Sequence, residues 1–437
     1  MNQLLSPKQI IQLDTNLYCE VEKYIGGGGQ GEVYQANLNG KLVALKWYFP
    51  EQATEEQYHA LEMLINSGAP NEKFLWPLSL ATASQIKGFG YVMPLRGARY
   101  KSINDLMKRR IDPSFRILAT VGLELAHSFL QLHAKGFCYR DISFGNVFFD
   151  PDTGKVLICD NDNVTLDGDA NGGILGTPRF MAPEVVRGEA KPSTETDLFS
   201  LAVLLFYIFM IHHPLEGKKE AKIKCFDLPA MNKLYGTEPV FIFDPHDKSN
   251  IPILGYHDNA IIYWNLYSAQ LRNIFTKAFT NGIYDPKQGR IRESEWCHAM
   301  IALRDSIIYC GDCGAENFYE TDMMDHKKGK LCWSCQKLLN IPPHIRINNN
   351  IIMLNYDTKL FNHHIDPDKN YEFSKAIATV NQHPDLPDVW GLKNLSSETW
   401  HVTTVNNLTS KVEIGQNVKI ALGIKINFGK TTGEIRL

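Results

Sequence analysis

Apolar residues in the first hundred positions occur mainly in short or alternating runs, a pattern that favours β-strands. One stretch differs, because residues 54–65 carry apolar side chains at helical spacing. We therefore predict a β-rich N-terminal region that includes a helix. The apolar runs are separated by glycine-containing turns and lie at residues 18–24, 32–37, 42–47 and 90–94.

Past Leu95 the apolar residues recur every three or four positions, which indicates helices. Residues 115–134 follow this spacing, and residues 196–210 are apolar on nearly every side, as expected of a buried central helix. A larger helix-rich region is therefore predicted to follow the β-rich one.

Near Ile308 the pattern changes again and predicts further domains. Clustered cysteines are followed by Ile341-Pro342-Pro343 and an asparagine run, which indicate a linker. Short β-type runs between turn residues then suggest a small sandwich or barrel. The predicted parts are an N-terminal extension with a short helix, the two-part region, a cysteine module, a linker and a β-sandwich, at residues 1–16, 17–305, 306–340, 341–352 and 353–437.

Composition and charge narrow the class of protein. The 437 residues are 44% hydrophobic and 21% charged, which is typical of a globular chain of two or three domains. A formal net charge of −3 gives no reason to expect a nucleic-acid partner. We see no apolar run long enough to span a bilayer and no signal-peptide features, so we expect a cytoplasmic protein without a membrane partner.

Four fragments of the two-part region carry residue types suited to phosphoryl transfer. A glycine-rich loop comes first, then a lysine within a strand, then Arg140-Asp141 with Asn146, and finally an aspartate that ends a strand. Each fragment alone is weak evidence, but their order and spacing match the protein-kinase signature. Residues 17–305 therefore resemble a eukaryotic-type Ser/Thr protein kinase, and the resemblance implies an α+β fold with a β-rich and then an α-rich lobe. The fragments lie at 26–33, 43–46, 139–146 and 160–162.

The glycine-rich fragment points to a phosphate site. A backbone without Cβ atoms can fold over a triphosphate and direct its N–H groups at the oxygens. The glycines that match the signature are Gly26, Gly28 and Gly31. The resemblance adds residues that bind the rest of the ATP cofactor, namely Val33, Ala44 and Met93.

Lys46 lies within an apolar strand, so its ammonium group needs a charged partner. The resemblance implies that Lys46 holds the α- and β-phosphates of ATP and pairs with a helix glutamate. We choose Glu62 for that partner, because the residues after it resemble those of the family. Glu55 and Glu56 are the alternatives, and we expect them to be solvated.

The last two fragments supply the residues of the chemical step. By resemblance, Asp141 orients the acceptor hydroxyl and accepts its proton. Asn146 and Asp160 hold Mg²⁺, which prefers oxygen ligands. Asp162 is a further candidate that could assist or replace Asp160.

Several positions depart from the typical signature. Tyr139 replaces a histidine, and Asn161-Asp162 replace a phenylalanine and a glycine. Ser143 replaces a lysine that neutralises the transferred phosphate. Some atypical kinases, the RIO group among them, carry serine there, so we interpret the chain as an atypical enzyme. The alternative is a pseudokinase scaffold that binds ATP and partner proteins without turnover.

Two later fragments have architectural roles by the same resemblance. Glu184 is expected to be buried and to pair with Arg290 or Arg292. Asp197 is expected to cap the backbone of the catalytic loop. The hydroxyl residues that could accept phosphate in the activation segment are Thr165 and Thr177.

The clustered cysteines form two C-x₂-C pairs with eighteen residues between them. This spacing can place four thiolates tetrahedrally around Zn²⁺, and four cysteine ligands leave no open position for catalysis. We therefore predict a structural zinc ribbon. Its ligands would be Cys310, Cys313, Cys332 and Cys335.

The last part of the chain resembles a forkhead-associated (FHA) β-sandwich, a module that typically recognises phosphothreonine. The usual Gly-Arg is not evident, and Ile377 stands where the histidine would. The candidate ligand contacts are Ser374, Lys375 and Asn394. A degenerate interaction module is an equally good interpretation.

Kinase region, zinc ribbon and FHA-like tail together resemble bacterial Ser/Thr kinases of the tellurite-resistance-associated type. The resemblance implies transfer of the γ-phosphoryl group of Mg-ATP to a Ser or Thr hydroxyl of a protein, including the kinase itself, in bacterial stress or signalling. It also implies a von Willebrand-type protein and a phosphatase as partners. A kinase tethered to nucleic acid through the ribbon is a third hypothesis, which the mildly acidic charge disfavours.

Overall fold

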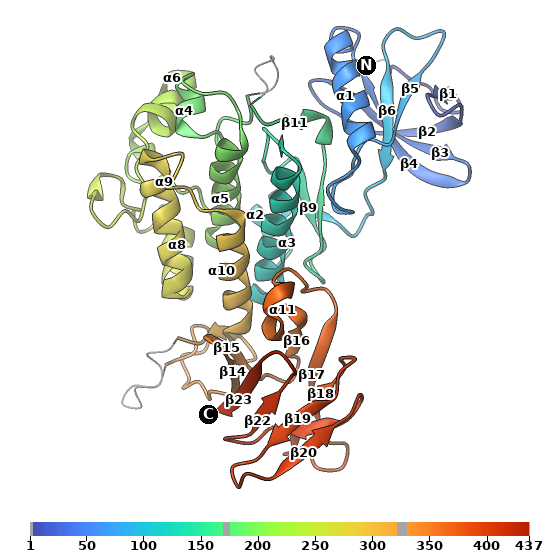
Figure 1. The fold of residues 1–437 in the computed structure, drawn as a ribbon. Helices are drawn as coiled ribbons and strands as arrows, with labels where there is room; N and C mark the ends of the chain where they lie inside the picture. Colours follow the sequence, from blue (N-terminus) through green and yellow to red (C-terminus); the bar gives the residue numbers. More distant parts are fainter. Residues whose placement is uncertain (1–2, 169–174, 321–329, 437) are drawn as a thin grey trace. The chain divides into compact units, whose positions relative to one another are not determined.

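The computed structural model describes residues 3–168, 175–320 and 330–436. The chain forms two compact units (Figure 1). Among the described residues, no helix is both long and apolar enough to cross a membrane. The first unit comprises Met1–Pro113, Thr120–Ile261 and Ile274–Cys297, and the second comprises Ser114–Ala119, Ile262–Asn273 and His298–Leu437.

The first unit begins with strands that close into a barrel in the order β1-β2-β3-β4-β6-β5, with every neighbouring pair antiparallel. Alternate side chains point to the interior, where Val21, Ala36, Leu45 and Val92 are buried. The barrel confirms the predicted β-rich N-terminal region. Its strands are β1 (Ile10–Leu13), β2 (Tyr18–Gly27), β3 (Gly31–Leu38), β4 (Lys41–Tyr48), β5 (Ser79–Thr82) and β6 (Gly90–Pro94).

The N-terminal extension belongs to this barrel, which corrects the predicted short helix. Ile10–Leu13 forms β1 and pairs with both β2 and β5. Ile11 and Leu13 are buried while Ile10 is exposed, so the burial follows the period of a strand. A short apolar run is compatible with either a helix or a strand. Here the segment forms a strand because β2 and β5 supply its hydrogen-bond partners.

Helix α1 (Glu55–Ser67) lies between β4 and β5 in sequence and is capped at both ends. The Thr54 hydroxyl accepts a hydrogen bond from a backbone N–H of the first turn. At the other end, the ammonium group of Lys135 donates to the carbonyl oxygens of Ser67, Gly68 and Ala69, each at 3.1 Å. A cation at this end also offsets the partial negative charge of the helix terminus.

The rest of the first unit is mainly helical, as predicted, and α5 (Thr194–Met210) lies at its centre. Every residue of Thr196–Met210 is buried. Ser193 caps the helix and forms a capping box with Thr196. Further helices of the chain, of which α3, α7, α8 and α10 lie partly in the second unit, are α2 (Ile103–Met107), α3 (Phe115–Ala134), α4 (Pro183–Val186), α6 (Leu228–Met231), α7 (Asp258–Leu266), α8 (Ala269–Phe279), α9 (Asn281–Tyr284) and α10 (Glu293–Asp305).

Short strands fix the loops that lie between α3 and α4. The pairs are antiparallel, β8 with β11 and β9 with both β7 and β10. These strands are β7 (Lys101–Ser102), β8 (Phe137–Cys138), β9 (Val147–Phe149), β10 (Val156–Ile158) and β11 (Thr165–Leu166). A single turn of 3₁₀-helix, η1 (Asn161–Asn163), follows β10.

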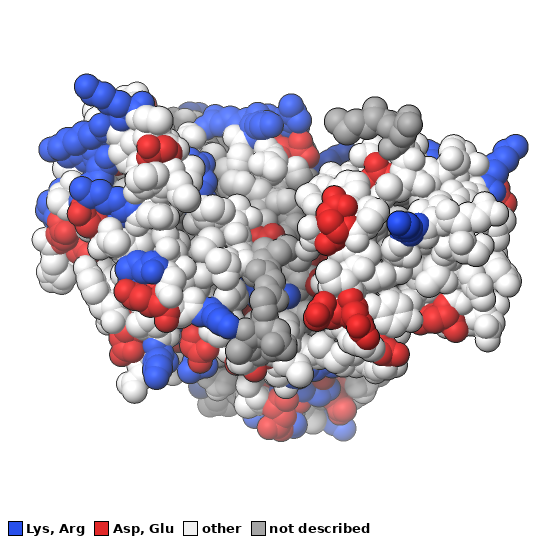
Figure 2. Space-filling model, turned by 90° about the horizontal axis from the view of Figure 1, so that it is seen from above, with Lys and Arg blue, Asp and Glu red and all other residues white. Residues whose placement is uncertain are grey.

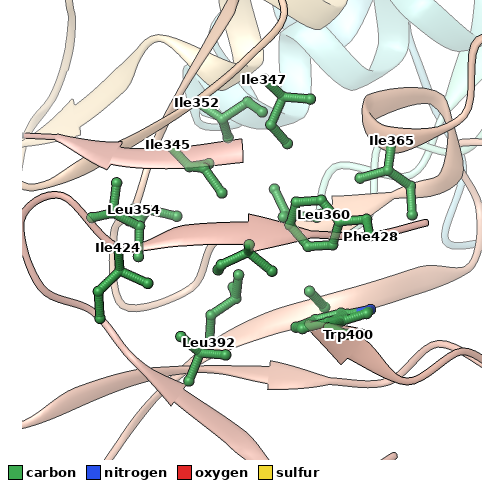
Figure 3. Packing of buried hydrophobic residues seen from close by; sticks show 14 of the residues in the cluster. Ile345, Ile347, Ile352, Leu354, Leu360, Ile365, Leu392, Trp400, Ile424 and Phe428 are labelled. Atoms are coloured by element: carbon green, nitrogen blue, oxygen red, sulfur yellow. The ribbon is translucent and has the colours of Figure 1, made fainter. Parts of the chain in front are cut away.

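The second unit contains the cysteine module, with strands β12 (Ile307–Tyr309) and β13 (Glu316–Phe318), and a two-sheet sandwich. Side chains from both sheets fill one core, which includes Ile345, Leu360, Leu392 and Trp400 (Figure 3). One sheet has the order β15-β14-β23-β22-β19-β20 and the other β16-β17-β18-β21. The strands are β14 (His344–Ile347), β15 (Asn350–Met353), β16 (Lys359–Phe361), β17 (Ala376–Gln382), β18 (Trp390–Asn394), β19 (Trp400–Thr403), β20 (Thr409–Val412), β21 (Asn417–Lys419), β22 (Lys425–Asn427) and β23 (Thr432–Arg436).

The segment predicted as a linker, 341–352, is part of the sandwich instead. His344–Ile347 is β14, which pairs with β15 and with the C-terminal strand β23. Ile345 and Ile347 are fully buried. The asparagine run is therefore a hairpin turn, and Asn348 takes the positive φ of 53° that such a turn needs and asparagine tolerates.

Side-chain hydrogen bonds join the cysteine module and the preceding helix to the sandwich. The Asn355 amide donates to the carbonyl oxygen of Ile307 at 2.8 Å, and both groups are buried. Asp305, the last residue of α10, lies 3.1 Å from Nε2 of His364 in α11 (Asn362–Ile365). The second unit is therefore held together by polar contacts as well as by its apolar core.

Candidate active site

The loop that follows β8 carries Asp141, and α5 fixes its backbone. The N–H groups of Tyr139 and Arg140 both donate to the Asp197 carboxylate, the latter at 3.0 Å. This confirms the predicted capping role of Asp197. Arg140 has a positive φ of 71°, and its Nε donates to the carbonyl oxygen of Asn163 at 2.6 Å, which ties the loop to the turn after β10.

Behind this loop, His133 of α3 lies between two carboxylates. Its Nε2 is 3.2 Å from Asp197, and its Nδ1 contacts Glu293 of α10. Burial alone would lower the pKa of His133, but hydrogen bonds to the two carboxylates and their charges raise it to about 9. His133 is therefore a buried cation that connects three helices beneath the loop.

The Asp141 carboxylate is oriented by two donors. The Asn146 amide nitrogen donates to its Oδ2 at 3.0 Å and to its backbone carbonyl at 2.8 Å. The Thr177 hydroxyl donates to its Oδ1 at 2.7 Å. The two donors therefore fix the orientation of the carboxylate that is predicted to accept the proton of the acceptor hydroxyl.

The two predicted Mg²⁺ ligands lie next to each other because β9 and β10 pair. Val147 is opposite Ile158, and the Cys159 N–H donates to the Asn146 carbonyl at 2.8 Å. Asp160 follows with a left-handed backbone, φ 47° and ψ 45°, and its side chain is 44% exposed. Asn146 uses its amide nitrogen on Asp141, so its amide oxygen is the atom that fits a hard cation beside the Asp160 carboxylate.

Tyr139, which replaces a histidine of the signature, also connects these strands. Its side chain is fully buried, and its hydroxyl donates to the carbonyl oxygen of Cys159, the residue before Asp160. The ring packs edge-on against Phe129 of α3. Tyr139 therefore provides a polar link between the loop that carries Asp141 and the end of β10.

The glycine-rich loop joins β2 to β3. Packing against a neighbouring strand requires glycine at one of its positions but not at others. A Cβ at Gly31 would lie 2.2 Å from the carbonyl oxygen of Trp47, so the neighbouring strand requires glycine. A Cβ at Gly26, Gly28 or Gly29 would have no atom within 4 Å. Packing within the protein does not explain these three glycines, and the open side of the loop fits the close approach of a triphosphate.

The residues predicted to surround the adenine share one apolar cluster. Ala44 lies opposite Met93 in the pairing of β4 with β6, and both are buried. Val33 and Leu157 are partly exposed and pack against the same cluster. Leu157 was not predicted, because nothing in the sequence distinguishes it from the other apolar residues of β10. The cluster offers an apolar wall that fits an adenine ring.

The ammonium group of Lys46 lies within reach of three polar side chains. It is 2.7 Å from Oδ2 of Asp162, 3.1 Å from Oε1 of Gln30 and 3.9 Å from Oδ1 of Asp160. Burial alone would lower the pKa of Lys46, but the charges of Asp162 and Asp160 raise it. Burial alone would raise the pKa of Asp162, but the charge of Lys46 and hydrogen bonds from its neighbours lower it. The pair is therefore ionised.

The structure corrects the assignment of Glu62 as the partner of Lys46. The Glu62 side chain is 55% exposed, and its carboxylate lies 3.4 Å from Nδ1 of His59 on the same helix. The buried face of α1 carries Leu61 and Leu64, so Glu62 points away from the barrel. The partner is Asp162, from the turn after β10, which was predicted only as a candidate metal ligand.

Glu184, at the end of the activation segment, pairs with Arg290. Nη2 of Arg290 donates to both carboxylate oxygens, at 2.6 and 2.9 Å, and both residues are buried. The backbone N–H of Arg292 donates to Glu295 instead. This confirms the predicted pairing and selects Arg290 from the two alternatives.

The four cysteines of the second unit converge. Their sulfur atoms all lie within 4.8 Å of one another, with Cys310–Cys335 at 3.6 Å and Cys313–Cys332 at 3.7 Å. The side-chain amide of Asn317 donates to the Cys332 sulfur at 3.6 Å, as a group that supports a thiolate ligand would. Four sulfur atoms at this separation fit a tetrahedral Zn²⁺.

The candidate ligand contacts of the sandwich divide into two groups. Ser374 and Lys375 are exposed. Asn394 is fully buried, its amide nitrogen donates to the carbonyl oxygens of Glu398 and Val412, and its Oδ1 accepts from Ser396. Asn394 therefore stabilises the turn after β18, and its prediction as a ligand contact is wrong.

The face that contains the barrel and the helical part of the first unit carries acidic and basic side chains in a mixed arrangement (Figure 2). A hollow separates the barrel, at the right, from the helical part, at the left, and acidic side chains border it. No field of one sign covers this face, in agreement with the formal net charge of −3.

Comparison with known proteins places residues 19–279 in the protein kinase domain family. The chain is 30% identical over 119 residues to the probable serine/threonine-protein kinase CCRP1 of Zea mays, which covers 26% of this chain and 19% of the relative. It is 29% identical over 209 residues to the serine/threonine-protein kinase ppk11 of Schizosaccharomyces pombe, covering 46% and 64%. It is 30% identical over 135 residues to the serine/threonine-protein kinase PknK of Mycobacterium bovis, covering 30% and 12%. The matches span less than two thirds of each relative's length.

Proposed function

The chain belongs to the protein kinase family, and from this premise we propose that it transfers the γ-phosphoryl group of Mg-ATP to a Ser or Thr hydroxyl of a protein. The observation that carries the proposal is a continuous series of contacts. Lys46 lies 3.9 Å from Asp160, the residue before Asp160 binds the backbone of Asn146, and Asn146 lies 3.0 Å from Asp141. The related Ser/Thr kinases support the choice of acceptor.

Each residue has a role that follows from its position. Asp141, oriented by Asn146 and Thr177, accepts the proton of the acceptor hydroxyl. Lys46 holds the phosphates under the glycine-rich loop. Asn146 and Asp160 would hold Mg²⁺, which neutralises phosphate charge when it is bound. Ser143 offers no cation, so neutralisation of the transferred group falls to the metal and Lys46.

The second unit has a proposed role in structure and recruitment. Four converging sulfur atoms support a structural Zn²⁺ at Cys310, Cys313, Cys332 and Cys335. The two-sheet architecture supports an FHA-like interaction module. Phosphopeptide binding there would use Ser374 and Lys375.

The cellular setting rests on the resemblance to tellurite-resistance-associated kinases. On that basis we expect a cytoplasmic enzyme of bacterial stress or signalling, whose partners are a protein substrate, a von Willebrand-type protein and a phosphatase.

The test is a phosphoryl-transfer assay with purified chain, Mg²⁺ and γ-labelled ATP, with label followed on the chain and on a generic protein acceptor. We expect label with the wild type and none with Asp141→Ala. Asp112→Asn, a substitution at an exposed residue, serves as the matched control. A wild-type chain that binds Mg-ATP but transfers no label would support the pseudokinase scaffold instead.

A further inference from the structure

We propose that Asp162 is the positioning residue for Lys46, in the place where the sequence predicted a helix glutamate. The inference rests on the proposed function, in which Lys46 holds the α- and β-phosphates of ATP. Asp162 lies at the position where the family signature has a glycine, so a side chain is present here that the signature does not contain. We assign to this side chain the role of holding Lys46 in position.

The first observation is the set of donors that converge on the Asp162 carboxylate. The Lys46 ammonium and the Tyr48 hydroxyl both donate to its Oδ2, at 2.7 and 2.5 Å. The Tyr91 hydroxyl donates to its Oδ1 at 3.0 Å. The side chain of Asp162 is 0% exposed. A buried carboxylate is stable only when it is paired and hydrogen-bonded, and here all three donors come from the barrel.

The sheet register explains why these donors meet. Lys46 and Tyr48 are two residues apart on β4, so their side chains point to the same face. Tyr91 lies directly opposite Lys46 on β6. The turn η1 then brings Asp162 against this face. The lysine is thus held by the strand β10 and its following turn rather than by α1.

The second observation separates the roles of the two aspartates. Asp160 is 44% exposed, whereas Asp162 is buried. Both carboxylate oxygens of Asp162 accept hydrogen bonds from the barrel, so it is committed to Lys46 and is not available to assist or replace Asp160 as a metal ligand.

The hydrogen bond that links α1 to this network comes from a neutral side chain. The Gln57 amide nitrogen donates to the Tyr48 hydroxyl at 3.0 Å, and the same hydroxyl donates to Asp162. Gln57 therefore is a residue of α1 whose side chain reaches this network by a hydrogen bond. This makes Gln57 the site at which a glutamate can be tested as a replacement for Asp162.

The experiment measures the Mg-ATP dissociation constant, together with KM and kcat, for Asp162→Asn, Glu62→Gln and the control Asp112→Asn. We expect Asp162→Asn to weaken Mg-ATP binding and raise KM by about tenfold, because an unrestrained lysine no longer meets the phosphates. Glu62→Gln and Asp112→Asn should stay within about twofold of the wild type. Equal losses in Asp162→Asn and Glu62→Gln, or no loss in Asp162→Asn, would overturn the proposal.

A double-mutant cycle with Lys46→Met shows whether Asp162 acts through the lysine. In the Lys46→Met background, Asp162→Asn should change the Mg-ATP dissociation constant by less than about twofold. A full additional loss there would contradict the proposal. If Asp162→Asn lowers the melting temperature, the double variant should recover it, because the buried lysine left without its partner is gone.

Restoring Mg-ATP affinity with a second substitution is a result that a merely structural role of Asp162 would not give. Gln57→Glu added to Asp162→Asn should restore part of the lost Mg-ATP affinity by returning a carboxylate to the network, whereas Gln57→Ala should not. Absence of rescue together with an additive cycle would reject the role of Asp162. A wild-type chain that binds Mg-ATP without transferring phosphate would reject the proposed function alone, because the binding cycle would still be measurable.

Discussion

The Thr177 hydroxyl donates a 2.7 Å hydrogen bond to the Asp141 carboxylate. A phosphate on Thr177 would replace this donor with negative charge beside a carboxylate, so the residue is unsuited to activation by phosphorylation. We expect Thr177→Glu to abolish phosphoryl transfer and Thr177→Val to lower kcat about tenfold, whereas Thr177→Ser keeps the donor and most of the activity. Steady-state kinetics measure this, and an active Thr177→Glu variant would refute it.

Two glycines of the same loop should respond differently to alanine. In Gly31→Ala, the new Cβ would lie 2.2 Å from the Trp47 carbonyl oxygen, so we expect a loss of about 1–3 kcal/mol in the free energy of unfolding. Gly28→Ala meets no atom within 4 Å and should leave stability within about 0.5 kcal/mol, yet weaken Mg-ATP binding. Thermal unfolding and ATP titration of both variants give the comparison. Equal melting temperatures would contradict the packing argument.

His133 should make the stability of the first unit depend on pH. Its pKa of about 9 in the folded chain lies above the ordinary 6.5, so its contribution is complete below about pH 6.5 and lost as the pH rises through about 9. The full contribution is on the order of 3 kcal/mol. We expect the wild type to lose stability over this range relative to His133→Gln. His246→Gln, at an exposed histidine, is the control and should follow the wild type.

Zinc should be bound at the cysteine cluster and should stabilise the second unit. We expect the purified chain to contain one Zn²⁺, and Cys313→Ser to lose the metal and to unfold the module at a lower temperature. Cys225→Ser, at an exposed cysteine of the first unit, should retain both. Elemental analysis and calorimetry measure the two quantities. A stable metal-free chain with four reactive thiols at the cluster would show that the sulfur atoms converge for another reason.

The sequence located the residues of the active site whose roles depend on local motifs, and missed those that depend on tertiary contacts. The pairing of β9 with β10 brings Asn146 close to Asp160, and Asn146 in turn binds Asp141 of the preceding loop. The partner of Lys46 comes from 116 residues away, and no pattern of spacing specifies it. Helical periodicity does indicate which α1 side chains face the barrel. Gln57 lies four residues before the buried Leu61 and so shares its face, whereas Glu62 does not.

Two predictions about the fold were wrong for the same reason. In each case, pairing with neighbouring strands made the segment a strand. Residues 10–13 became a strand through pairing with β2 and β5, and residues 344–347 through pairing with β15 and β23. Both are short runs, one in the predicted N-terminal extension and the other in the predicted linker. Burial in a sheet was not visible in their sequence, whereas the long apolar run of α5 left no alternative to a buried helix.

The distance in sequence between Lys46 and Asp162 also bears on synthesis of the chain. The barrel is complete at Pro94, yet the carboxylate that neutralises its buried lysine emerges from the ribosome much later. Until then the ammonium group of Lys46 lacks its anionic partner, which makes its burial unfavourable. We therefore expect the barrel to reach its final packing only after the turn at Asp162 has been made.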